Sequence, residues 1–363
     1  MRIFLCGDVM TGRGIDQALP HPCDPRLHER YVKSAIDYVR MANQPIPTPV
    51  DLHYIWGAAL QELKRARPDA SIINLETSIT RCDAYVAKGI NYRMSPENAA
   101  CLVAARVDCC VLANNHVLDW GRAGLLETLA TLERLRIKTA GAGRNAAQAS
   151  APAILAETNA GRTLVFSFAS QTSGVPRNWA ATHDRAGVNF LPALSDATVA
   201  AITDLVADVR RENDVVVVSL HWGPNWGYDI PEEQRWFAHE LINRADISIV
   251  HGHSSHHAKS IEVYKNRLIL YGCGDFLNDY EGIKGHREFR SDLALMYIAD
   301  LGPGSNLAAL ELVPLQIRRF QLIQAANRDV AWLQQTLDRE SRPFGTRVGT
   351  APGGRLALSW PTM

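Results

Sequence analysis

The chain has 363 residues, of which 47% are hydrophobic and 21% charged, and its 38 basic and 38 acidic residues leave a formal net charge of zero. This composition predicts a core large enough for one large domain or two ordinary ones, and it gives no electrostatic basis for binding nucleic acid or an anionic membrane. No apolar run reaches about eighteen residues and the first residues enter a strand at once, so we expect no transmembrane helix, no signal peptide and a cytoplasmic protein.

The first 280 residues repeat one order: an apolar run, a polar or glycine-rich turn, then a helix-like stretch. Strands are expected at 2–6, 70–74, 107–112, 164–169, 214–220, 247–250 and 267–271. Apolar spacing near 3.6 residues predicts helices at 52–67, 96–104, 124–135, 194–211 and 232–244. Strand–turn–helix repetition of this kind predicts a layered α/β fold, in which ligands gather at the carboxyl ends of the strands.

We expect residues 1–300 to form the catalytic domain, interrupted by a proline-rich insertion at about 20–50. Residues 301–363 are expected to be a small extension packed on it, with a strand at 308–314, a helix at 329–338 and a tail rich in glycine and proline. The seven cysteines include no CxxC pair, which argues against a thiolate zinc site and suits a reducing compartment.

Metal-competent side chains follow the expected strands. They are Asp8, Glu76, Asn115, His116, His221, His251, His253, His256 and His257. Four of these histidines fall within residues 251–257, where protonated rings would repel one another, so we expect neutral ligands that face a shared cation. Mixed oxygen and imidazole ligands suit manganese, iron or zinc. Their number exceeds the needs of one ion, so we expect one or two divalent ions, and a pair would lie about 3.5–4 Å apart.

Five short motifs carry a resemblance to a known family. They are Gly7-Asp8, Asn74-Leu75-Glu76, Asn114-Asn115-His116, His221-Trp222-Gly223 and Gly252-His253-Ser254-Ser255-His256. In this order they resemble the motifs of the CapA family, which is named for poly-γ-glutamate capsule synthesis and is related to calcineurin-like metallophosphatases. The resemblance covers about residues 1–300. It implies a four-layer α/β sandwich around a binuclear metal centre.

The resemblance also implies a first ion held by Asp8 and His256, with Glu76 as the carboxylate that bridges to the second ion. The sequence departs from the metallophosphatase pattern at one place. The expected Asp-x-His opening reads Asp8-Val9-Met10, so the first ion loses a histidine ligand. This predicts either a weakened first site or only one tightly held ion, and it puts ordinary phosphoesterase activity in question.

The second ion would take Asn115, His221 and His253 as its ligands, again by resemblance. His116, directly after Asn115, is similar to the histidine that acts as an acid or stabilises charge on the substrate. Asp119 either orients His116 or caps the next turn.

Three further side chains allow two interpretations each. Arg13, in Gly12-Arg13-Gly14, either contacts an anionic group or lies at a helix start on the surface. The functional interpretation of His251 is a further metal ligand, and that of His257 is a catalytic base. The alternative for both is a role in orienting the ligands. The glycine turn that ends in Asp275 is either a tight turn beside the site or part of it.

Three functions are compatible with these residues. The first is hydrolysis, by metal-activated water, of a carboxylate- or phosphate-bearing small molecule or peptide, such as a poly-γ-glutamate-like substrate. The second is metal-assisted epimerisation of an amino acid or peptide C-terminus by two bases, His116 and a histidine of the cluster. The third is a non-catalytic role in poly-γ-glutamate synthesis or export. The oligomeric state is left open.

Overall fold

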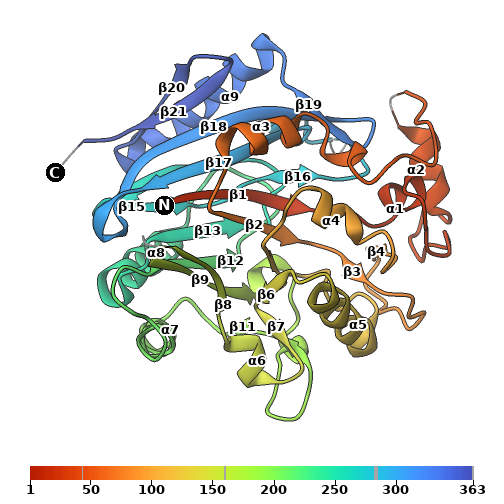
Figure 1. Ribbon diagram of the computed structural model, residues 1–363, viewed down its shortest axis with the longest axis horizontal. Helices are drawn as coiled ribbons and strands as arrows, with labels where there is room; N and C mark the ends of the chain where they lie inside the picture. Colours follow the sequence, from red (N-terminus) through yellow and green to blue (C-terminus); the bar gives the residue numbers. More distant parts are fainter. Residues whose placement is uncertain (43, 159–160, 282–284, 362–363) are drawn as a thin grey trace.

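The computed structural model of the chain describes residues 1–42, 44–158, 161–281 and 285–361, and it consists of two β-sheets packed face to face between helices (Figure 1). Within these residues the first sheet has ten strands. Its path is β20 (Arg347–Ala351), β21 (Arg355–Ser359), β18 (Leu307–Arg318), β17 (Leu293–Leu301), β1 (Arg2–Val9), β2 (Ala70–Leu75), β5 (Cys109–Val111) and β6 (Lys138–Ala140). In addition, β16 (Asp275–Leu277) pairs with β1, and β19 (Gln321–Gln324) pairs with β18.

The second sheet has seven strands in the described part of the chain. Its path is β11 (Phe190–Leu191), β9 (Gly161–Ser170), β12 (Val215–His221), β13 (Ile249–His253), β15 (Arg267–Leu270) and β14 (Ile261–Tyr264), and β8 (Ala153–Thr158) also pairs with β9. Two minor sheets pair β3 (Ser78–Ile79) with β4 (Arg93–Met94) and β7 (Ala142–Gly143) with β10 (Gly187–Val188). The central strands of both main sheets are parallel, as expected for strands joined by helices.

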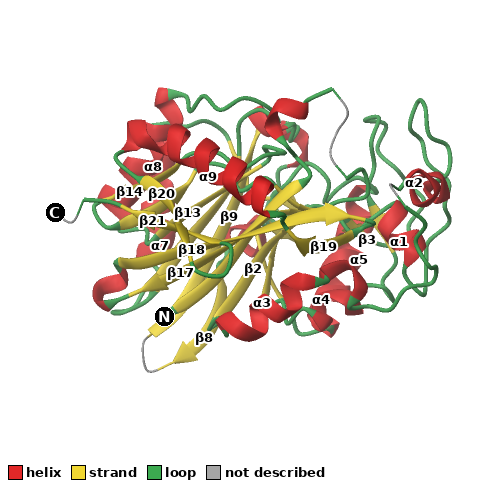
Figure 2. Ribbon diagram, turned by 90° about the horizontal axis from the view of Figure 1, so that it is seen from above, coloured by secondary structure: helices red, strands yellow, loops and turns green. Residues whose placement is uncertain are grey.

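Helices, drawn in red in Figure 2, connect these strands. They are α1 (Gly14–Ala18), α2 (Ala35–Met41), α3 (Ala58–Ala66), α4 (Ala100–Ala104), α5 (Gly121–Arg134), α6 (Ala146–Ser150), α7 (Asp196–Ala207), α8 (Glu232–Ala245) and α9 (Asn327–Ser341). None of those in the described residues combines the length and apolar composition needed to cross a bilayer.

Neighbouring side chains along each strand point to opposite faces of its sheet, and this alternation produces the layers. In β2, Ile73 packs against the helices of the first sheet, whereas Ile72 faces the second sheet. In β12, Val217 faces the first sheet and Val216 packs under α7 and α8. Because both faces of each sheet are covered, these strands are continuous runs of apolar, often β-branched residues. The result is a helix–sheet–sheet–helix arrangement, which confirms the expected four-layer α/β sandwich.

Two local expectations were wrong. The strand expected to end at residue 250 continues to His253, so that His251 and His253 lie inside β13 rather than in the loop after it. The stretch expected to be a glycine- and proline-rich tail forms β20 and β21 instead. Its signal was missed because these strands are stabilised by pairing rather than by strong local patterning: β21 pairs with β18, with Ala357 opposite Glu311, and β20 pairs with β21.

The segment expected as a C-terminal extension continues the first sheet, because its strand β18 pairs with the whole length of β17. The segment expected as an insertion carries α2 and is joined to the start of α1 by an ion pair between Glu29 and Arg13. The domain boundary near residue 300 stays a prediction.

Candidate metal centre and active site

The parallel strands bring distant side chains to one edge of the sandwich. Asp8 lies near the end of β1, in register with Asn74 of β2 on one side and Asp275 of β16 on the other. In the second sheet, His221 and His253 end neighbouring strands and are register partners. The carboxyl ends of both sheets therefore meet here, at the place where α/β proteins bind ligands.

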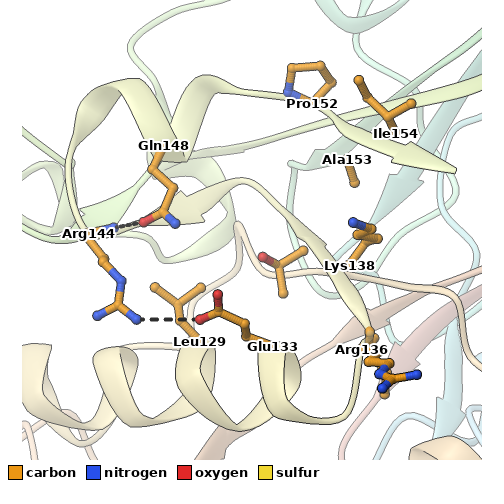
Figure 3. A pocket seen from close by; sticks show the side chains of 11 residues that line it. Leu129, Glu133, Arg136, Lys138, Arg144, Gln148, Pro152, Ala153 and Ile154 are labelled. Carbon is orange, nitrogen blue, oxygen red and sulfur yellow. Dashed lines mark hydrogen bonds and ion pairs between the residues drawn. The ribbon is translucent and has the colours of Figure 1, made fainter.

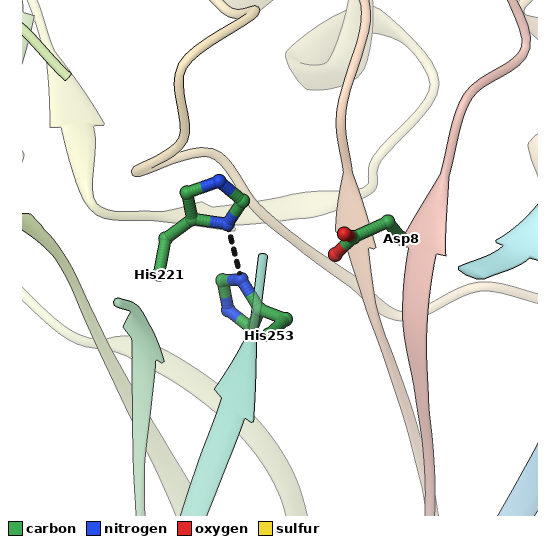
Figure 4. Close-up of side chains that lie close together, drawn as sticks. All are labelled: Asp8, His221 and His253. Carbon is green, nitrogen blue, oxygen red and sulfur yellow. Dashed lines mark hydrogen bonds between the residues drawn. The ribbon is translucent and has the colours of Figure 1, made fainter. Parts of the chain in front are cut away.

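The first candidate ligand group consists of Asp8, His221 and His253 (Figure 4). Their ligand atoms lie within 4.8 Å of one another, and all three residues are buried. The two rings approach through their Nδ1 atoms, 2.7 Å apart. Asn115 Oδ1 is an acceptor 3.1 Å from His221 Nε2, so a neutral His221 carries its proton on Nε2 and leaves Nδ1 bare. A histidine ligand is oriented in this way, by a hydrogen bond to its other nitrogen.

The second candidate group is Asp8, His256 and Asp275, whose ligand atoms also lie within 4.8 Å of one another. His256 Nδ1 is 2.9 Å from Asp275 Oδ1, and Tyr280 donates its hydroxyl to Asp275 Oδ2 at 2.5 Å. The loss of a histidine at Met10 predicted a site short of one ligand. Asp275 offers a further carboxylate at that site, and the glycine turn before it was its only signal in the sequence.

One oxygen in this region is unsatisfied. Asp8 Oδ1 accepts a hydrogen bond from Asn74 Nδ2 at 2.8 Å, but Asp8 Oδ2 is buried without a partner among the described residues. A buried carboxylate oxygen without a partner is costly. Asp8 belongs to both ligand groups, so a divalent cation in either group would satisfy it. Carboxylate and imidazole donors suit manganese, iron or zinc, and the residues therefore fit the expected ion.

Glu76, directly after β2, belongs to neither group. Its Oε1 lies 3.8 Å from His116 Nε2 and 3.9 Å from His221 Nε2, and its Oε2 accepts a longer hydrogen bond from Asn74 at 3.3 Å. In this arrangement Asp8, rather than Glu76, is the carboxylate common to both groups. The bridging role expected for Glu76 stays a prediction, as does that of Asn115 as a direct ligand.

The electrostatics of the cluster favour a bound cation. Burial, with the neighbouring Asp275, raises the pKa of Asp8 to about 7. Burial and the charge of Asp8 raise the pKa of Glu76 well above its usual value. Burial also lowers the pKa values of His221 and His253, so both rings are neutral and able to coordinate. Burial opposes protonation of His256 as well, but the Asp275 carboxylate raises its pKa above the ordinary value.

His116 lies beside this cluster in a network of its own. Its Nδ1 is 2.7 Å from Asp119 Oδ2, and Lys88 Nζ contacts Asp119 Oδ1 at 2.7 Å. Asp119 also accepts the backbone N–H of Tyr92, so the expected orienting role has a geometric basis. Burial lowers the pKa of His116 to about 4. Lys88 lies in a stretch without a recognisable motif, and nothing in the sequence indicated it.

Three expected site residues lie apart from the ligand groups. His251 reaches between the sheets, where its Nε2 is 2.8 Å from the carbonyl oxygen of Cys6. His257 packs against Phe289, with ring centroids 4.5 Å apart, and its Nε2 is buried without a partner among the described residues. Arg13 is buried and paired with Asp279 and Glu29.

A cavity of about 430 Å³ opens over the cluster. Glu76, His116, His221 and His256 line it, and so does Lys88. This places His221, His256 and the His116 network around one cavity.

A larger cavity, of about 670 Å³, lies elsewhere, between α5, α6 and the edge strands β6 and β8 (Figure 3). Arg136, Lys138 and Arg144 line it with exposed side chains, and Arg144 approaches Glu133 at 3.8 Å. None of its residues belongs to either ligand group, so the smaller cavity is the candidate site.

The model of one protein family, described as "Bacterial capsule synthesis protein PGA_cap", matches residues 2–280. This chain belongs to that family. The match includes every residue of the two ligand groups, together with His116 and Asp119.

Relatives with curated names carry the same association. A probable polyglutamine synthesis accessory protein of Mycobacterium tuberculosis is 46% identical over 98% of this chain and 95% of its own length. The PGA biosynthesis protein CapA of Bacillus subtilis is 28% identical over 57% of this chain and 52% of its own. Among solved structures, a 5'-nucleotidase precursor of Thermus thermophilus matches with a TM-score of 0.47 and 12% identity, over 94% of this chain and 58% of that chain.

Proposed function

We propose that this chain is a metal-dependent enzyme that hydrolyses a carboxylate- or phosphate-bearing substrate, a small molecule or a peptide. The observation that supports this proposal best is the unsatisfied Oδ2 of Asp8, an atom of the one residue common to two ligand groups. A cluster with a purely structural role would be expected to pair its buried carboxylates with cations or hydrogen-bond donors.

In this proposal Asp8, His221 and His253 hold one divalent ion, and Asp8, Asp275 and His256 hold a second. Manganese, iron or zinc suits these donors. When bound, such an ion polarises the substrate oxygen and lowers the pKa of water towards neutrality.

His116 is the residue proposed to move a proton. Asp119 is an acceptor, so a neutral His116 carries its proton on Nδ1 and turns a bare Nε2 towards Glu76, 3.8 Å away. With its pKa near 4, His116 is neutral at pH 7, so it accepts a proton from the attacking water and then donates it to the leaving group. Lys88 and Asp119 keep the ring in this orientation.

The test compares the chelated protein with the metal-reconstituted protein, measuring metal content by mass spectrometry and hydrolysis with a panel of phosphate esters and peptides. We expect binding of one or two ions and activity only in the loaded form. Asp8→Asn should abolish both. The control for the loss of an equally buried carboxylate is Asp16→Asn. It loses one of the two backbone hydrogen bonds that Asp16 accepts from Ser95 and Cys23, but it should keep metal binding. Full activity after complete removal of metal would refute the proposal.

Epimerisation is a second candidate, supported by the placement of two imidazoles. His116 follows a strand of the first sheet, His256 follows a strand of the second, and both line the same cavity. Two bases on different sides of a substrate could remove the Cα proton of a chain end on one face and return a proton on the other. In this case His256 acts as a base rather than a ligand. Incorporation of solvent deuterium at Cα without bond cleavage would distinguish epimerisation from hydrolysis.

A non-catalytic role agrees with the accessory function named for the mycobacterial relative. It predicts tight binding of poly-γ-glutamate by metal-free protein. The same reconstitution experiment separates this role from catalysis, since an accessory factor would bind the polymer equally well after chelation.

A further inference from the structure

The cavity above the candidate metal centre has an apolar and aromatic wall. The side chains that form it are Met10, Tyr31, Tyr38, Ile90, Tyr92 and Tyr280. They come from four separate stretches of chain: the end of β1, the segment 20–50, the loop before β4 and the residues after β16. Glu76, His116, His221 and His256 line the same cavity, so a substrate bound beside them would also contact this wall.

Two of these side chains expose apolar surface to solvent: Tyr31 is 81% exposed and Ile90 is 40% exposed. They are part of a concentration of such residues. Of the eight large hydrophobic residues exposed in the described chain, five lie in the two segments that flank the cavity, namely Tyr31, Ile36, Met41, Tyr85 and Ile90. Tyr31 and Ile90 also line the cavity itself, and exposed apolar side chains on the lining of a cavity are typical of a ligand-binding site.

The cavity has few positive charges to offer a polyanion. Lysine and arginine contribute only Arg13 and Lys88 to its described lining. Arg13 is already paired with Asp279 and Glu29, and Lys88 with Asp119. A substrate with one charge per residue would bring several carboxylates to a cavity whose lysine and arginine are already paired, so their charges would be poorly compensated.

We infer that this site takes a substrate with a single anionic group beside an aromatic or aliphatic side chain, such as a peptide chain end with an apolar last residue, and that it disfavours an anionic polymer. The proposed function supplies one part of this inference, the position of the anionic group at the metal centre. The wall itself supplies the other part, the apolar neighbour.

The experiment measures binding by titration calorimetry to the metal-loaded protein, with metal content determined in the same samples. The probes are two acetylated tetrapeptides, Gly-Gly-Gly-Phe and Gly-Gly-Gly-Glu, and a γ-linked glutamate oligomer. Burial of one aromatic side chain should make the phenylalanine peptide bind about 10- to 100-fold more tightly than the glutamate peptide. Equal or tighter binding of either glutamate probe, or no binding of any probe, would overturn the inference.

Two variants locate the preference on the wall. Ile90→Asp and Tyr31→Ser should each reduce the preference for the phenylalanine peptide to a few-fold, and neither should unfold the protein, because both side chains are exposed. The matched control is Ile154→Asp, since Ile154 is 45% exposed but lines the other cavity. A preference that survives both wall variants would also overturn the inference.

The two proposals fail in different ways. Metal binding without discrimination between the probes would refute the substrate class and leave the metal enzyme intact. A preference for the phenylalanine peptide in a protein that binds no metal would refute the proposed function and leave the apolar wall as the basis of recognition.

Discussion

Two groups of buried carboxylates lie close together in this protein and are treated in opposite ways. Near α1, Asp279 and Glu29 share the guanidinium of Arg13, with Glu29 Oε1 at 2.8 Å from it. At the end of β1, Asp8, Glu76 and Asp275 are equally buried. Among the described residues, no lysine or arginine forms an ion pair with these three. Within that part of the chain, Asp8 Oδ2 receives no hydrogen bond from a nitrogen or hydroxyl donor, and the side chain beside it, Glu76, is another carboxyl group.

The contrast separates an acid cluster whose charge is compensated within the chain from one whose charge is not. Burial disfavours charge in both places, but Arg13 compensates it within the chain. In the Asp8 cluster the compensation must come from protons or from an external cation, and the raised pKa of Asp8, about 7, reflects that deficit. The same chemistry therefore stabilises the fold at one cluster, and at the other it agrees with the proposed metal site.

Among these predictions, removal of the Arg13 guanidinium should cause the largest loss of stability. Arg13→Met leaves Asp279 and Glu29 as uncompensated buried charges and is expected to lower the free energy of unfolding by about 3–5 kcal/mol. Urea denaturation measures this loss. The control is Arg26→Met, whose partner Asp24 is on the surface, with a 68% exposed arginine side chain and an expected cost of at most about 1 kcal/mol. Equal losses in the two variants would contradict the comparison.

In the Asp8 cluster, which has no lysine or arginine partner among the described residues, neutralising a carboxylate should not lower the free energy of unfolding of the metal-free protein. Asp275→Asn removes a charge next to Asp8, which offsets the weakened contacts with His256 and Tyr280, so the chelated protein should be about as stable as the parent. Its affinity for divalent metal should fall by about 100-fold, which corresponds to about 2.7 kcal/mol. Calorimetric metal titration tests the expected loss of affinity, and thermal melts of the chelated form test the expected stability. Unchanged metal affinity would exclude Asp275 as a ligand.

Lys88 forms an ion pair with the buried Asp119, close to the Asp8 cluster. This acid, unlike Asp8, is therefore compensated by a cation of the chain. Lys88→Met should cost about 1.5–3 kcal/mol through the loss of a charge-assisted hydrogen bond. Rescue by Lys88→Arg would show that charge, rather than packing, is responsible. NMR of the His116 ring nitrogens reports whether Nδ1 remains the protonated one. A ring unaffected in the methionine variant would exclude Lys88 from positioning His116.

The smallest effect is expected at His257, which was predicted as a catalytic base but packs among aromatic rings. Its Nε2 is buried without a partner in the described part of the chain, and burial lowers its pKa to about 4. His257→Phe removes this unsatisfied atom while keeping the stacking on Phe289, so stability should change by at most about 1 kcal/mol. Metal affinity should be unchanged. A large loss of activity or metal binding would restore His257 to the site.

Much of the site was predictable from local sequence, since each side chain lies at the end of an apolar strand. Asp8, His221 and His253 were expected as ligands, and the structure brings their ligand atoms within 4.8 Å of one another. Asp275 was left open because its turn resembles any tight glycine turn. Lys88 had no local signal, because its importance arises only from contact with Asp119, 31 positions away along the chain.

The order of strands, turns and helices, and thereby the layered α/β fold, was determined by the sequence itself, because hydrophobic periodicity and turn residues act over a few positions. Only the tertiary structure decided which side chains meet. His251 and His253 lie on the same face of β13, two residues apart, yet His251 lies beside Cys6 and His253 beside Asp8. Their roles depend on how deep each lies against the opposite sheet. That depth is set by the packing of β1 against β13, which no local pattern records.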